Sequence, residues 1–170
     1  MAASTRPDSQ PDDLALPSAA RVLVLGDVIL DSYLRGQANR ISAEAPVPII
    51  DVESEEYRLG GAANVAANIT ALGASCDLIG AVGDDGSGKT FRKLLAHVGI
   101  ADAGLVTDPP RPTSHKTRVL ARNQQVLRLD QESRAPIDER TRALALERLT
   151  GLISTADAVI IEDYDKGLLD

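Results

Sequence analysis

Several residues in the first half of this 170-residue sequence have the types and spacing that suit the binding of hydroxyl groups. Asp27 and Asp31 follow the apolar run RVLVLG, and GGAAN at 60–64 opens a stretch with helical spacing. Ligands of open α/β sheets bind beyond the carboxyl ends of the strands. Glycines let a ligand approach the backbone, free N–H groups at a helix start donate hydrogen bonds, and asparagine donates and accepts them. We therefore expect a site for vicinal sugar hydroxyls, made of Asp31, Gly60, Gly61 and Asn64.

A second pattern, GDDGSGKT at 83–90, satisfies G-x-x-x-x-G-K-[ST], the phosphate-binding loop of P-loop NTPases. It lies between an apolar run and a stretch with helical spacing, as such a loop requires. Asp84 and Asp85 lie inside the loop, however, and their negative charge would oppose a polyphosphate. The alternative is a tight turn in which Asp85 or Ser87 caps the next helix and Lys89 faces solvent. A P-loop NTPase therefore stays open as an alternative function.

The order of apolar runs and helical stretches predicts the fold class. Continuous apolar runs indicate buried strands at 21–26, 76–82 and 158–161. Apolar residues at helical spacing indicate helices over 60–73, over 87–98, and from Asp138, a plausible N-cap, through Ile153. This alternation predicts an α/β fold whose main sheet is parallel.

Two more polar stretches interrupt that alternation. The first, 32–59, holds Pro46, Pro48 and short β-prone pieces. The second, 114–130, contains the runs KTRVLA and QVLRLD, separated by a turn around 122–124. We interpret both stretches as one small β layer inserted into the main fold.

Composition and charge exclude several classes of protein. Asp and Glu outnumber Lys and Arg by 25 to 18, so the net charge of −7 argues against binding nucleic acid through bulk positive potential. No run of about 18 apolar residues predicts a membrane helix. The single Cys76 fits a reducing cytoplasm, and the histidines and cysteine show no metal-ligand spacing. Residues 1–18, with three prolines and no apolar core of a targeting signal, are expected to form a disordered tail.

After residue 18 the chain resembles the ribokinase-like (PfkB) sugar kinases. The resemblance rests on LGDVILD, GGAANVAANITALGA and VGDDGSGKTFRKLLAHVGI. RISAEAPVPI, RVLARNQQVLRLD and EDYDKG more narrowly resemble kinases of D-glycero-β-D-manno-heptose 7-phosphate. The resemblance implies a ribokinase-like, mainly parallel sheet flanked by helices, with a β lid at about 32–59 and 114–130. The lid would close over the sugar and join two copies in a homodimer.

The resemblance also implies a reaction and further site residues. ATP, with Mg²⁺, would phosphorylate the anomeric hydroxyl of the heptose 7-phosphate to give the 1,7-bisphosphate, in the synthesis of ADP-heptose for the lipopolysaccharide core. Guanidinium and ammonium groups of the lid would bind the phosphate already on the sugar. The added candidates are Lys116, Arg118 and Arg122 for this phosphate, Asn123 and Gln124 at the lid turn, and Asp163 and Lys166 after the last predicted strand.

The catalytic base of these kinases is an aspartate in a late G-A-G-D segment, which is not found in this sequence. No catalytic residue is therefore assigned. We expect residues 19–170 to form the N-terminal, sugar-binding portion of the kinase domain, without the C-terminal half of the fold and inactive alone. A non-catalytic paralogue that binds a sugar phosphate or dimerises remains a further alternative.

Overall fold

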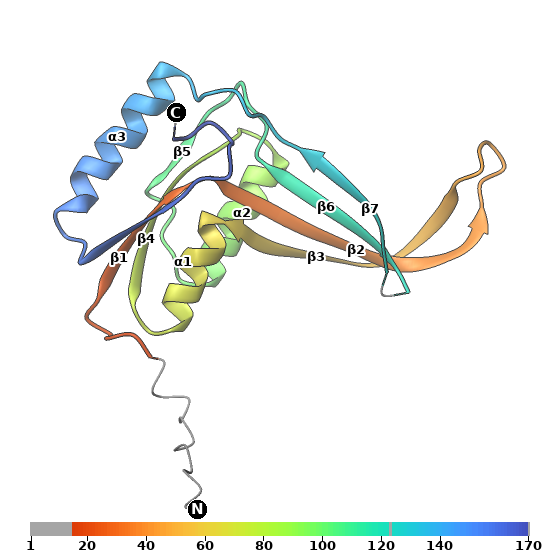
Figure 1. Ribbon diagram of the computed structural model, residues 1–170, viewed down its shortest axis with the longest axis horizontal. Coiled ribbons are helices and arrows are strands. Elements are labelled where there is room, and N and C mark those ends of the chain that lie inside the picture. Colours follow the sequence, from red (N-terminus) through yellow and green to blue (C-terminus); the bar gives the residue numbers. More distant parts are fainter. Residues whose placement is uncertain (1–14, 123, 170) are drawn as a thin grey trace, which may run out of the picture.

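The chain folds into two β-sheets, and the second sheet begins where the first strand of the first sheet ends (Figure 1). The computed structural model describes residues 15–122 and 124–169, and in these the strands form two four-stranded sheets. Most of the predicted tail, residues 1–14, lies outside the described residues. The first sheet has the order β5-β4-β1-β8 and comprises β1 (Arg21–Gly26), β4 (Ser75–Val82), β5 (Leu105–Thr107) and β8 (Ala158–Glu162).

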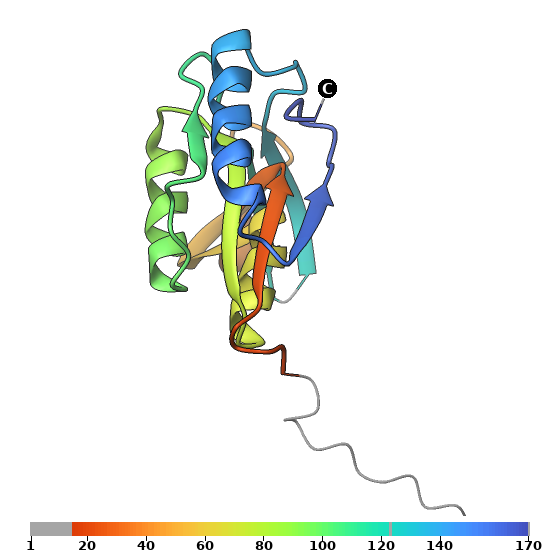
Figure 2. The same cartoon turned by 90° about the vertical axis from the view of Figure 1, so that its left-hand side faces the viewer.

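All pairings in this first sheet are parallel, and Figure 2 shows its strands running in the same direction. Helices α1 (Ala62–Ala71) and α2 (Gly86–His97) pack on one face through a core that includes Val24 and Phe91. Helix α3 (Glu139–Ile153) packs on the other face, against Leu23 and Ile79. The predicted strand–helix alternation is confirmed. The short strand β5 was not predicted, because three residues are too few for a recognisable pattern.

The second sheet, which we call the lid, has the order β3-β2-β6-β7. Its strands are β2 (Val28–Ile41), β3 (Pro48–Gly61), β6 (His115–Ala121) and β7 (Gln124–Gln131). β2 pairs antiparallel with β3 and parallel with β6, and β6 pairs antiparallel with β7. The turn predicted between the last two strands is present, with Arg122 at a φ of 49°.

The β2–β3 hairpin corrects one prediction. The sequence suggested short β pieces in 32–59, whereas the structure has two strands of 14 residues that extend beyond β6 and β7 (Figure 1). Much of β3 is exposed on both faces, so hydrogen bonds between the strands, rather than buried side chains, hold this part of the hairpin. A strand without a buried face lacks the apolar alternation from which strands are recognised.

Buried Asp27 forms the joint at which the lid leaves the first sheet. Its carbonyl oxygen accepts a hydrogen bond from the N–H of Ala62, where α1 begins. Its Oδ2 atom accepts hydrogen bonds from the backbone N–H groups of Tyr164 and Lys166, at 2.9 and 3.0 Å. Gly61 packs on the same carbonyl with a φ of 58°, and a Cβ there would lie 2.2 Å from the oxygen. One residue thus ties the bend between β1 and β2 to the start of α1 and to the loop after β8.

Asp85 fills a comparable role at the start of α2. Its Oδ1 atom accepts hydrogen bonds from the N–H of Gly88 and from the hydroxyl of Thr113, and its Oδ2 accepts from the N–H of Thr113. Burial raises the pKa of this carboxyl, but the hydrogen bonds from Gly88 and Thr113 outweigh burial and lower the pKa. Asp85, rather than Ser87, is therefore the N-cap of α2.

Replacing Asp85 with alanine should lower the free energy of unfolding by about 1–3 kcal/mol, because the cap and the contacts to Thr113 are lost together. Urea denaturation measures the change. The exposed neighbour Asp84, as Asp84→Ala, is the matched control and should change little. In the wild type, the contribution of Asp85 should be complete above about pH 4 and be lost as pH falls through the lowered folded pKa. Equal losses in the two variants would contradict the capping role.

Candidate functional site

A cleft of about 380 Å³ lies where the lid meets α1 and the loop after β8. Six of the eleven residues predicted for the site line it: Asp31, Gly60, Gly61, Asn64, Lys116 and Arg118. They come from β2, β3, α1 and β6, so the cleft exists only when the lid strands are paired correctly. Asn64 lies in the first turn of α1 and is exposed.

Strand register places several charged side chains of the lid on one face. Asp31 on β2 lies opposite Arg58 on β3 and Lys116 on β6. Two residues further along β2, Tyr33 lies opposite Arg118. Because alternate residues of a strand share a face, these side chains all point to the cleft side of the lid.

Asp31 is held in place by a cation and by bare backbone. Its Oδ1 atom accepts a hydrogen bond from Nη1 of Arg118, and both side chains are largely buried, at 19% and 24% exposure. The hydrogen bond to Asp31 raises the pKa of the Arg118 guanidinium. The other carboxylate oxygen lies so near Gly60 that a Cβ there would be 2.4 Å from it. Glycine at position 60 therefore leaves room for the carboxylate at the floor of the cleft.

Tyr33 was not predicted to belong to the site, yet its ring gathers three guanidinium groups. The central carbons of Arg58, Arg118 and Arg35 lie 4.9, 5.4 and 5.8 Å from the ring centroid. Such cation–π contacts are favourable and hold the side chains at the ring. Tyr33, Arg58 and Tyr164 also line the cleft. A tyrosine on a polar strand carries no sequence signal for this role.

Glu132, after the end of β7, joins two of the predicted lysines. Its Oε2 atom lies 2.8 Å from Nζ of Lys116, and its Oε1 atom lies 3.1 Å from Nζ of Lys166. Burial raises the pKa of this carboxyl, but the hydrogen bonds from the two lysines outweigh burial and lower the pKa. Lys166 is buried behind the cleft rather than in its lining. Lys166 thus supports Lys116 through Glu132. Glu132 is not among the residues predicted from the sequence.

Four predicted residues are not brought to the cleft. Arg122 and Gln124 lie at the turn between β6 and β7, where Nη2 of Arg122 donates a hydrogen bond to Oδ1 of Asn39. Arg122 follows Arg118 by four positions, which is about 13 Å along an extended strand. Asp163 lies outside the lining, and its Oδ1 accepts a hydrogen bond from the N–H of Asp165. The fourth is the buried Lys166. Asn123 lies outside the described residues.

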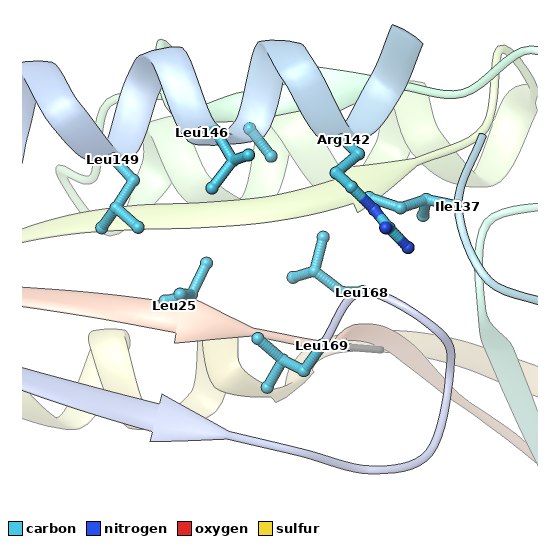
Figure 3. A pocket seen from close by; sticks show the side chains of 8 residues that line it. Leu25, Ile137, Arg142, Leu146, Leu149, Leu168 and Leu169 are labelled. Atoms are coloured by element: carbon cyan, nitrogen blue, oxygen red, sulfur yellow. The ribbon is translucent and has the colours of Figure 1, made fainter. Parts of the chain in front are cut away.

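A second cavity, of about 350 Å³, lies between α3 and the end of the first sheet. Figure 3 shows its leucine side chains, among them Leu25, Leu149 and Leu168, around an interior that one charged residue, Arg142, borders. Hydroxyl groups need hydrogen-bond partners, so this cavity does not suit a sugar. The cleft under the lid remains the candidate site.

The GDDGSGKT loop is arranged against a nucleotide phosphate. The carboxylate of Asp85 accepts the hydrogen bond from the N–H of Gly88 at the start of α2, which in a P-loop would face a phosphate. Lys89 is exposed. Within the described residues, no group of three or more His, Cys, Asp or Glu side chains could hold a metal ion. In the same part of the chain, no helix is long and apolar enough to span a membrane.

Sequence comparison identifies relatives over most of the chain. Residues 19–162 match the profile described as pfkB family carbohydrate kinase. Bifunctional protein HldE of Helicobacter pylori strain P12 is 46% identical over 150 residues, covering 88% of this chain and 32% of that protein. Bifunctional protein HldE of Helicobacter hepaticus is 44% identical over 150 residues, covering 88% and 31%. The chain therefore spans about a third of the length of these curated relatives.

Solved structures share the fold. The acarbose kinase Mak1, described as microbiome-derived, superposes with a TM-score of 0.60 at 23% identity, over 84% of this chain and 45% of that one. Arabidopsis thaliana ribokinase, complexed with ribose and ATP, gives a TM-score of 0.59 at 18% identity over the same shares. These likenesses confirm the predicted ribokinase-like α/β fold, and the match covers less than half of each of these solved chains.

Removing the charge of Glu132 should destabilise the protein, because it leaves the buried Lys166 without this counter-charge. We expect Glu132→Gln to lower the free energy of unfolding by about 2–3 kcal/mol in a urea titration. The matched control is Glu56→Gln, since the Glu56–Arg58 pair is exposed and its loss should change little. Adding Lys166→Met to Glu132→Gln should recover part of the loss. A double variant no more stable than Glu132→Gln would contradict this account.

Proposed function

The chain belongs to the pfkB family of carbohydrate kinases, and we propose that the cleft under the lid binds the sugar that the protein phosphorylates. The observation that supports this proposal is the combination of groups at one place. Asp31 can accept hydrogen bonds from hydroxyls, Gly60 and Gly61 leave backbone accessible, and Asn64 can donate and accept. A rigid set of such groups fixes the orientation of a polyol.

We further propose that this sugar is D-glycero-β-D-manno-heptose 7-phosphate, phosphorylated by ATP on its anomeric hydroxyl to the 1,7-bisphosphate. Two observations support this choice over an unphosphorylated sugar. The first is the similarity to proteins named Bifunctional protein HldE, at 43–46% identity, together with the heptose-kinase-like segments. The second is the presence of Arg58, Lys116 and Arg118 in the cleft lining, since such cations bind phosphate. A cytoplasmic role in ADP-heptose and lipopolysaccharide synthesis belongs to the same proposal.

ATP and Mg²⁺ enter this proposal through the family alone. Among related solved structures, one ribokinase is complexed with ADP and another with ribose and ATP. The described residues of this chain form no metal-binding cluster. The GDDGSGKT loop is not free to bind a phosphate, because Asp85 caps α2. We therefore assign no step to these groups here. With no G-A-G-D segment in its sequence, the chain alone is expected to bind the sugar without turning over ATP.

Binding of heptose 7-phosphate, measured by isothermal titration calorimetry, tests the site. Asn64→Ala should weaken binding about tenfold, a loss of about 1.4 kcal/mol, because a hydrogen-bonding group at the cleft is removed. The matched control is Asn68→Ala, an exposed asparagine one turn further along α1, which should leave the affinity unchanged.

The same calorimeter distinguishes the P-loop alternative. Lys89→Ala should have no effect on sugar binding, because Lys89 lies outside the cleft. Binding of ATP that Lys89→Ala abolishes, in a chain that binds no sugar phosphate, would contradict the proposed function and favour a P-loop NTPase.

We also propose that a second copy of the chain covers the back face of the lid, the face away from the cleft. Lid residues 52, 57, 127 and 129 carry exposed apolar side chains, of which Leu127 and Leu129 are 51% and 53% exposed. Register places these leucines on the back face, because their neighbour Asp130 bonds Lys116 on the cleft side. Exposed apolar patches of this kind are typical of protein interfaces.

A charge on the back face should therefore prevent dimerisation. We expect light scattering coupled to size exclusion to show a dimer for the wild type and a monomer for Leu129→Glu. Ile153→Glu is the matched control, because Ile153 is 47% exposed but lies on α3, away from the lid. A wild-type monomer at tens of micromolar would contradict the proposal.

A further inference from the structure

Every cation that lines the cleft already has a carboxylate partner. Arg58 bonds Glu56 at 2.7 Å, and Lys116 bonds Glu132 at 2.8 Å and Asp130 at 3.2 Å. Arg118 bonds Asp31. The partners differ in one respect. Among the described residues that line the cleft, Asp31 is the one carboxylate, whereas the other partners lie outside the lining. The residue best placed to accept a sugar hydroxyl is therefore also the counter-ion of Arg118.

This arrangement affects neutral and phosphorylated sugars differently. A neutral sugar whose vicinal hydroxyls take both oxygens of Asp31 must compete with Arg118 for Oδ1. Both side chains are more than three-quarters buried, and a guanidinium that loses its counter-ion in such a place is unfavourable. A sugar phosphate brings its own anion, which pairs with a guanidinium through two parallel hydrogen bonds. The phosphate can replace the carboxylate on Arg118 while a hydroxyl replaces the guanidinium on Asp31.

We propose that the Asp31–Arg118 ion pair makes this cleft selective for sugar phosphates over neutral sugars, because Arg118 holds Oδ1 of Asp31 until a phosphate takes the guanidinium. The proposal rests on the proposed function, because it takes the cleft as the sugar site. It assigns the pair a role in specificity that goes beyond phosphate binding. Arg118 both attracts the correct ligand and penalises the neutral one, and negative discrimination of this kind is a common source of specificity.

Tyr33 keeps the released guanidinium at the cleft. Arg118 lies 5.4 Å from the centroid of its ring and Arg58 lies 4.9 Å from it, so both cations share one aromatic surface. Breaking the bond to Asp31 does not break the contact with the ring. Arg118 therefore remains in position to meet a phosphate, with Arg58 beside it.

Calorimetry with two ligands tests the proposal on the full chain, using D-glycero-D-manno-heptose and its 7-phosphate. The wild type should bind the 7-phosphate at least a hundredfold more tightly. Arg118→Gln should weaken binding of the 7-phosphate at least tenfold and strengthen binding of the neutral heptose about tenfold, because Asp31 becomes free. Arg92→Gln is the matched control, since Arg92 is also paired with a carboxylate, Asp102, but lies on α2 outside the cleft lining, and it should leave both affinities unchanged.

A second variant keeps the test valid if Arg118→Gln folds poorly. Arg118→Lys retains a positive charge that can pair with Asp31, so neutral heptose should still bind weakly. The 7-phosphate should bind less tightly than to the wild type, because lysine lacks the paired N–H donors of the guanidinium. Weaker binding of the 7-phosphate by Arg118→Gln with no gain for neutral heptose would make Arg118 a phosphate ligand only and overturn the proposal. Equal wild-type affinities for the two sugars would overturn it as well. A wild type that binds neither sugar would instead contradict the proposed function.

Discussion

The buried carboxylate of Asp27 connects three segments that lie far apart in the sequence. Its Oδ2 atom receives the backbone N–H groups of residues 164 and 166, while its carbonyl oxygen receives the first N–H of α1. Asp27 satisfies these donors without lining the cleft, since the residue is only 4% exposed. The cleft depends on this joint, because β2, α1 and the loop carrying Tyr164 all start from it. Asp27 therefore shapes the cleft through its position, whereas Asp31, four residues later, lines it.

In the lid, strand register determines which side chains face the cleft. Because side chains alternate along a strand, a slip of one residue would carry Asp31, Lys116 and Arg118 to the back face. The observed register instead places the cations toward the cleft, with Leu127 and Leu129 on the opposite side. A second joint anchors this register to the core. His115 on β6 lies 2.9 Å from the hydroxyl of Ser32 and 3.1 Å from that of Ser87 on α2.

What could be predicted from the sequence depended on how local each signal was. RVLVLG identified a strand because its side chains are buried on both faces, and Asp31, Gly60 and Asn64 could be grouped because strand ends and helix starts meet at one edge. Tyr33, Arg58 and Glu132 could not be found in this way. Their roles depend on neighbours on other strands, such as Lys116 for Glu132. The sequence of a single strand does not determine its register with its neighbours. Arg122 lies outside the cleft lining, and a basic residue in a lid segment does not by itself reveal its distance from the cleft.

The cations of this cleft are already paired with carboxylates, so a ligand that binds them must compete with these partners. The chain carries a net charge of −7, yet it brings three cations to one small volume. Carboxylates on the lid and beside it make this possible, because unpaired cations at such distances would repel one another. An anionic ligand therefore exchanges partners with the protein instead of meeting free charges. Lys116 keeps Glu132 when the ligand enters, and Glu132 is also bound to Lys166 in the core, so one part of the network stays fixed to the fold. Arg118 has Asp31 as its partner within the cleft, and the exchange must therefore begin at that pair.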